Sequence, residues 1–66
     1  MSLKEKINNR LNNLQLELGS GNHLTDSDRV VELIDSISKF WSVLSEEDKD
    51  YIQAARHAIE NRMEWK

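Results

Sequence analysis

Few side chains in this chain of 66 residues could take part in catalysis or metal binding. It has no cysteine, which excludes a thiolate nucleophile and a thiolate zinc site. Its two histidines, His23 and His57, form no His-x-x-x-His pair, and we expect both to be solvated surface side chains. No strand-linked glycine-rich phosphate loop with its lysine is present. The sequence therefore predicts a protein that is not an enzyme and has no catalytic residue, metal or other cofactor.

Two groups of acidic residues, within 25–28 and 45–50, could be mistaken for metal ligands. Each group follows a hydroxyl residue, Thr25 or Ser45, which can cap a helix by accepting a free backbone N–H. Carboxylates in the first turn are favoured by the helix dipole, and the spacing does not match an EF-hand. We therefore interpret both groups as helix starts.

Basic side chains are the candidates for nucleic-acid contact. The formal charge of −3 argues against broad electrostatic capture of DNA. Residues 1–18 carry three bases and two acids, whereas residues 19–66 carry six bases and ten acids. A local basic patch could still contact phosphates weakly. Its candidate members are Lys4, Lys6, Arg10, Lys39 and Arg56.

Three apolar side chains are candidates for contact with a partner protein. Leu16 and Val31 fall away from the main apolar stripes of their segments, and they would mark a contact patch if they shared one surface. Trp65 either serves as an exposed anchor or packs over the end of the fold. Phe40 and Trp41 are expected in the core, with a platform for stacking unpaired bases as the alternative.

Apolar residues spaced three and four apart predict three helices, at about residues 2–18, 26–44 and 46–64. Ser2 is expected to cap the first helix, and Gly19 to end it in a left-handed conformation. The widest apolar face lies on 26–44, which predicts that this segment, as one helix or two, is central. We therefore expect one domain over residues 1–66, an all-α fold that is a small antiparallel three-helix bundle or a bundle of four short helices.

Membrane association is not expected. No apolar run approaches the ~20 residues of a membrane span. The N-terminal residues lack the apolar region of a secretion signal. We therefore expect a cytoplasmic protein.

One stretch of the chain resembles a known family. The run 37–52, ISKFWSVLSEEDKDYI, with its continuation at 54–60 and the loop 22–24, is similar to the small helical accessory proteins encoded directly after the UvsW helicase in T4-like phages and cyanophages. The resemblance covers residues 20–65. It implies a four-helix bundle similar to the nucleic-acid-binding module of RecQ-type helicases, and a role in replication, recombination and repair in the host cytoplasm.

The leading hypothesis for function is a non-enzymatic accessory module of phage DNA recombination or repair. It would contact a helicase, or bind single-stranded or branched DNA weakly. The alternative is a protein-interaction or self-associating helical module with no nucleic-acid role, and the oligomeric state is open. Clustering of Lys4, Lys6 and Arg10 with Lys39 or Arg56 would favour DNA, whereas interleaved acids would favour the alternative.

Overall fold

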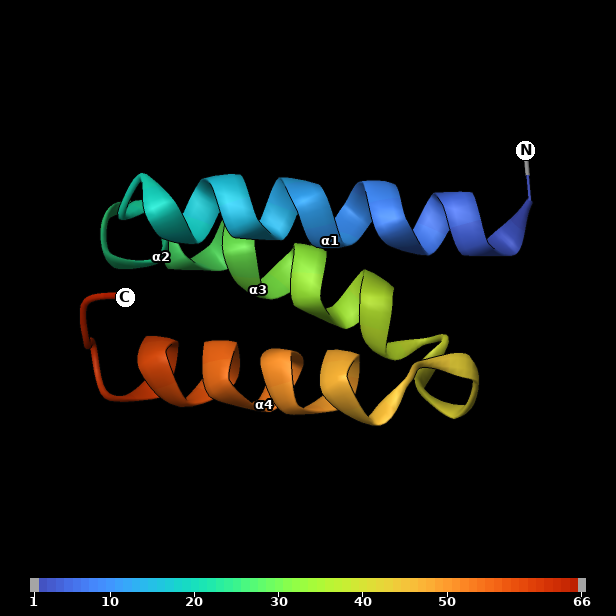
Figure 1. Ribbon diagram of the computed structural model, residues 1–66. Coiled ribbons are helices and arrows are strands. Elements are labelled where there is room, and N and C mark those ends of the chain that lie inside the picture. Colours follow the sequence, from blue (N-terminus) through green and yellow to red (C-terminus); the bar gives the residue numbers. More distant parts are fainter. Residues whose placement is uncertain (1, 66) are drawn as a thin grey trace.

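A computed structural model describes residues 2–65, and the regular structure in this range is entirely helical. The elements are α1 (Leu3–Gly19), α2 (Asn22–Thr25), α3 (Ser27–Ser38), the 3₁₀ turn η1 (Trp41–Val43) and α4 (Glu46–Glu60). The chain runs along α1, returns along α3 and reverses again into α4, so that α3 is antiparallel to both (Figure 1). The predicted all-α fold class is confirmed, and the one-turn α2 makes four helices in the described range.

Two of the three predicted helix caps are confirmed. The Ser2 hydroxyl accepts a hydrogen bond from the Glu5 backbone N–H at 3.2 Å, and the Ser45 hydroxyl accepts one from the Asp48 N–H at 3.2 Å. The prediction for Thr25 is wrong, because Thr25 lies inside α2 and Asp26 stands at the start of α3 without a side-chain cap. Residues 22–25 form a helical turn of their own, and α3 begins at Ser27, one residue after the predicted start.

The first helix ends differently from the prediction. Gly19 is still part of α1, and Gly21 is the glycine with a left-handed backbone, at φ 75°. The Gly21 N–H donates to the Leu18 carbonyl at 3.1 Å, which satisfies an acceptor at the end of the helix. The chain therefore turns two residues later than the first glycine suggests.

The segment 26–44 is not a single helix, because α3 ends at Ser38, and of the two alternatives left open by the sequence the structure has the broken one. The Ser36 and Ser38 hydroxyls donate to the Leu33 and Ile34 carbonyls at 2.8 and 2.9 Å, and such back-bonding competes with regular helical hydrogen bonds. At residues 40, 43 and 44 the backbone N–H donates to the carbonyl three residues earlier instead of four, which is the 3₁₀ pattern of η1. This turn reverses the chain, so that α4 can pack on α3.

The last helix ends at Glu60 rather than at the predicted residue 64. Arg62 has a left-handed backbone with φ 51°. The Arg62 N–H donates to Ile59 at 3.2 Å and the Met63 N–H to Ala58 at 2.8 Å, which is the pattern of a Schellman motif. As a result the C-terminal segment 61–65 turns back along the bundle.

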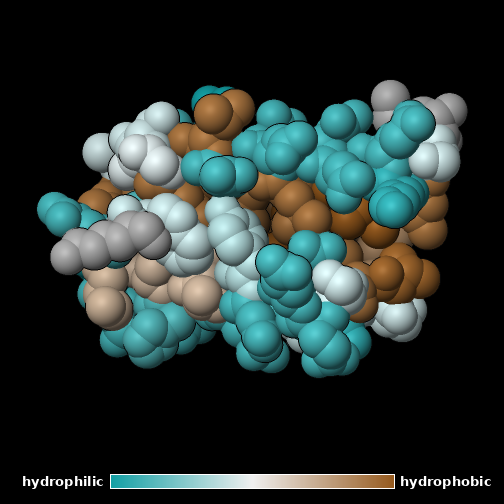
Figure 2. Space-filling view, in the orientation of Figure 1, coloured by the Kyte–Doolittle hydropathy of each residue, from teal (hydrophilic) through white to brown (hydrophobic). Residues whose placement is uncertain are grey.

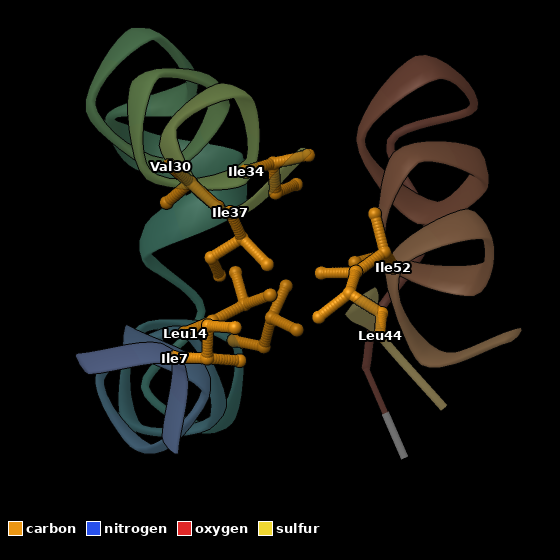
Figure 3. Close-up of a cluster of buried hydrophobic side chains, with 9 residues drawn as sticks. Ile7, Leu14, Val30, Ile34, Ile37, Leu44 and Ile52 are labelled. Carbon is orange, nitrogen blue, oxygen red and sulfur yellow. The ribbon is translucent and has the colours of Figure 1, made fainter. Parts of the chain in front are cut away.

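The core lies where α1, α3 and α4 meet. Figure 3 shows Ile7 and Leu14 of α1 directed toward Ile34 and Ile37 of α3, with Ile52 approaching from α4. The predicted stripes supply most of these side chains. Trp41 and Phe40 are half-buried and pack against this core from one end.

Candidate functional site

A groove runs between α1 and α4. Both helices pack on α3, and their backbones approach each other less closely than either approaches α3. In a bundle of three helices this arrangement leaves two apolar faces partly uncovered on the side opposite α3. Figure 2 shows apolar surface between the polar side chains of α1 and those of α4, on the side of the molecule that Figure 1 presents.

Three adjoining hollows make up this groove. The first hollow, of about 500 Å³, lies near the start of α1 beside Val43, Leu44 and Asp48. The second hollow, of about 400 Å³, shares Asp48 with the first and reaches Tyr51. The third hollow, of about 550 Å³, shares Asn12 and Gln15 with the second and ends at Trp65. Because neighbouring hollows share lining residues, they form one continuous groove, here called the α1/α4 groove.

Apolar side chains remain exposed along the α1/α4 groove. Leu3 is 45% exposed and Val43 is 57% exposed in the first hollow, and Leu16 is 68% exposed in the third. Leu11 and Tyr51 are half-buried in the second hollow. Exposed apolar side chains that follow one groove are typical of an interaction surface, whereas scattered ones are not.

The two sides of the groove differ in charge. Side chains from α4 place three carboxylates along it, those of Glu47, Asp48 and Asp50. Within residues 2–65 none of these three carboxylates forms an ion pair. The α1 side is lined by uncharged amides, namely Asn8, Asn12 and Gln15, and by Lys4 at its start. The groove therefore has one acidic side and one neutral side.

Of the predicted partner contacts, Leu16 and Trp65 are brought together in the third hollow. Val31 is half-buried on α3 and does not line this hollow, so Leu16 and Val31 do not form the single patch considered from the sequence. Trp65 is half-buried and its ring meets Tyr51 edge-on, with ring centroids 5.3 Å apart. Trp65 thus packs over the end of the bundle and still lines the groove.

His23 holds the segment that carries Trp65 in place. The expectation that His23 is solvated is wrong, because this side chain is 2% exposed. Its Nε2 donates to the Met63 carbonyl at 2.7 Å, since a carbonyl can only accept. No local sequence signal indicates this role, because the partner lies 40 residues away in the chain. His57 is exposed, as expected.

Tyr51 contributes a half-buried ring and a shielded hydroxyl to the wall of the second hollow. The hydroxyl has no hydrogen-bond partner among the described residues. Burial disfavours the charged phenolate and raises the pKa of Tyr51 above its ordinary value of 10.0. Tyr51 therefore stays neutral to higher pH than a free tyrosine, and its ring packs against Trp65.

The five basic residues predicted to contact DNA gather only in part. The guanidinium carbon of Arg10 lies 5.5 Å from the centroid of the Phe40 ring. Lys39 precedes Phe40 in the chain and is exposed. Lys4 and Lys6 are exposed on the first two turns of α1, with the acidic Glu5 between them in the sequence. This arrangement favours neither of the two hypotheses from the sequence alone.

Arg56 is the member of this set that is already engaged with the protein. It donates to Asp35 Oδ1 at 3.2 Å and to Ser38 Oγ at 3.0 Å, so it links α4 to α3. Lys49 lies over the ring of Trp41, the aromatic residue that follows Phe40, with Nζ 6.0 Å from the ring centroid. Both rings thus have a cation close to them, which leaves less free ring surface for stacking bases.

Neither a metal-binding cluster nor a membrane-spanning helix occurs among the described residues. Residues 2–65 hold no group of three or more His, Cys, Asp or Glu side chains that could bind a metal ion. Within these residues, no helix combines the length and the apolar character needed to cross a membrane. The α1/α4 groove and the bases near Phe40 are therefore the two surfaces from which function can be inferred.

Comparison of the chain with known proteins identifies no family. No family model matches the chain, and neither a curated protein nor a solved structure matches it. Function is therefore inferred from the two surfaces and from the residues that carry the resemblance stated above.

Proposed function

We propose that this chain is a non-enzymatic protein-interaction module that binds a segment of a partner protein in the α1/α4 groove. The observation that carries the proposal is the groove itself, in which exposed Leu3, Val43 and Leu16 follow one line between two helices. Burial of such side chains contributes about 25 cal/mol for each Å² removed from water. An interface at this place would therefore be driven mainly by the groove's apolar surface.

The resemblance supports a more specific role. Residues 37–52, which carry most of it, include the turn and the start of α4 that form one wall of the groove. We therefore place the module beside a UvsW-type helicase in phage recombination and repair, in the host cytoplasm. In this role it would act by binding the helicase and would not itself catalyse a reaction.

Weak binding of single-stranded or branched DNA is the second candidate function. The contact of Arg10 with Phe40, beside Lys39, supports it. Three or four converging bases would give a shallow salt dependence, with a slope on the order of −2 to −4 in a plot of log K against log salt. The net charge of −3 makes long-range attraction to DNA weak.

Calorimetric titration of the purified UvsW-type helicase from the same genome tests the proposal. The wild-type chain is compared with Leu16→Gln, which alters the groove, and with Val31→Thr, which alters a half-buried apolar side chain of α3 that lines none of the three hollows. Leu16→Gln is expected to weaken binding by at least about fivefold, since one exposed apolar anchor is lost. Val31→Thr should bind like the wild type.

Two results would contradict the proposal. One is absence of binding to the helicase at ~100 μM protein together with binding of forked DNA at low salt, which would favour the second candidate. The other is equal loss of helicase binding in Leu16→Gln and Val31→Thr, which would place the contact outside the α1/α4 groove.

A further inference from the structure

We infer that the occupant of the α1/α4 groove is an amphipathic helix with a basic flank, supplied by the partner protein. This inference rests on the proposed function and names the chemistry of the partner. Three properties of the groove lead to it: its length and walls, the spacing of its apolar side chains, and the charge of its α4 side.

The length and walls of the groove fit a helix. Its lining extends along α1 from Leu3 to Gly19, which is about 24 Å at 1.5 Å per residue, or the length of a helix of four to five turns. A helix lying there would contact α1 and α4 just as α3 does from the other side. An extended segment fits poorly, because helix walls offer it no ladder of free backbone N–H and C=O groups.

The apolar side chains are spaced for a helix that presents one stripe. Leu3 and Val43 stand at one end of the groove, Leu11 and Tyr51 in the middle, and Leu16 at the other end. Each of the three hollows could accept one or two apolar side chains from the partner. Side chains at positions i, i+3 or i+4, and i+7 of a helix lie on one face and advance along the groove in this way.

The acidic charge on the α4 side of the groove predicts a basic charge on the flank of the partner helix that faces it. Helix starts favour acids for local reasons, which account for Glu47 and Asp48 in the first turn of α4. Asp50 lies beyond that turn, and all three carboxylates line the same hollow without an ion pair in residues 2–65. Lysine or arginine on the facing flank of the partner would pair with them. The opposite flank would face uncharged Asn12 and Gln15 and needs no charge.

A second copy of this chain is a less suitable occupant. Each copy carries a net charge of −3, so two copies repel each other. The first turn of α4 would also bring its carboxylates near an acidic groove if that helix were the occupant. Dimerisation through the groove is therefore an outcome that would overturn the inference.

Two designed peptides of 18 residues provide the test. Both carry leucine at i, i+3, i+4 and i+7 spacing and glutamine on one flank; the other flank carries lysine in one peptide and glutamate in the other. We expect the lysine peptide to bind the chain at least about tenfold more tightly than the glutamate peptide at 50 mM salt. The preference should fall as salt is raised to 500 mM, because exposed charges are screened.

Variants of the chain show where the lysine peptide binds. The double variant Glu47→Gln/Asp50→Asn should reduce its affinity about threefold to tenfold, as expected for two exposed ion pairs. The control Asp26→Asn/Asp28→Asn removes the same charge at the start of α3, away from the groove lining, and should have a clearly smaller effect. Circular dichroism of each variant shows whether it is folded.

Each outcome either supports or overturns the inference. Equal affinity for the two peptides, or equal effects of the two double variants, would overturn it. If neither peptide binds while the helicase still binds in a Leu16-dependent manner, the inference fails and the proposed function stands. If the helicase also fails to bind, the proposed function fails as well. A dimer in sedimentation equilibrium that Leu16→Gln dissociates would make a second copy the occupant and overturn the inference.

Discussion

Two polar atoms of the C-terminal packing are buried without a hydrogen-bond partner in the described residues: the Tyr51 hydroxyl oxygen and His23 Nδ1. A buried polar group left without a partner costs about 1–3 kcal/mol. Both residues help to fix Trp65, since Tyr51 contacts its ring and His23 binds the Met63 carbonyl two residues before it. The end of the α1/α4 groove is therefore held by two residues whose side chains each bury a polar atom.

Replacing Tyr51 with phenylalanine tests the effect of burial on its pKa. Because that pKa is raised in the folded state, the unfolded chain loses the phenolic proton first, and this contribution to stability falls as pH rises above 10.0. Tyr51→Phe should remove this alkaline loss and leave the free energy of unfolding at pH 7 unchanged or about 1 kcal/mol higher. Urea unfolding at pH 8 and pH 10.5 measures both effects. If the free energy of unfolding of the two proteins had the same pH dependence, burial would not raise the pKa of Tyr51.

Replacing His23 with leucine tests how the C-terminal segment is held. Leucine cannot donate to the Met63 carbonyl, but it also removes the buried Nδ1, so we expect the free energy of unfolding to fall by less than the cost of a lost buried hydrogen bond, which is about 1–3 kcal/mol. His23→Gln, whose amide nitrogen can replace Nε2, should lose less. In a Trp41→Phe background, acrylamide quenching of Trp65 should increase in the leucine variant. Unchanged stability and quenching would show that this hydrogen bond does not hold the segment.

At the level of elements, helix starts were more predictable than helix ends. The hydroxyls of Ser2 and Ser45 act within three residues of sequence, so local pattern is sufficient to find them. The position of the break after Ser38 could not be predicted, because apolar residues continue at helical spacing through η1 and only the back-bonded serines mark the change. The turn at Arg62 was also missed, because arginine gives no signal for a left-handed backbone.

Loss of the Ser45 cap should destabilise the start of α4. The Ser45 hydroxyl accepts from the Asp48 N–H, and Ser45→Ala leaves this donor to water. We expect a fall of about 0.5–2 kcal/mol in the free energy of unfolding by urea, with an unchanged denaturant slope. Ser45→Asp should retain most of the stability, and Ser42→Ala, in η1, is the matched control. Equal effects at Ser45 and Ser42 would argue against the cap.

Glycine at position 62 should stabilise the end of α4. An L-residue with a left-handed backbone costs about 1–2 kcal/mol, and the greater freedom of glycine in the unfolded chain returns about 0.5–1 kcal/mol. Arg62→Gly should therefore raise the free energy of unfolding by up to about 1 kcal/mol, whereas Arg62→Ala, which keeps Cβ, should not. A stabilised alanine variant would instead attribute the effect to loss of the arginine side chain.

At the level of the whole molecule, the all-α class and most of the core could be predicted, because the apolar stripes of Val30, Ile34 and Ile37 are local patterns. The groove could not, since every long segment has an apolar face and sequence does not say which two helices stay apart. Leu16 could be recognised because it lies off the apolar stripe of the first helix. The position of Trp65 beside it could not be predicted, because it depends on the turn at Arg62. The predicted DNA contacts are dispersed because Arg56 binds α3 instead.

Binding of a partner protein in the α1/α4 groove can be mapped residue by residue. The measurement is a titration of the ¹⁵N-labelled chain with the proposed partner, a UvsW-type helicase, followed by amide spectra. We expect the largest changes at residues 11–16 and 47–51 and at the Trp65 indole, while the exposed surface of α3 around Glu32 changes little. Changes confined to the surroundings of Arg10, Phe40 and Lys39, or no change at all, would contradict it.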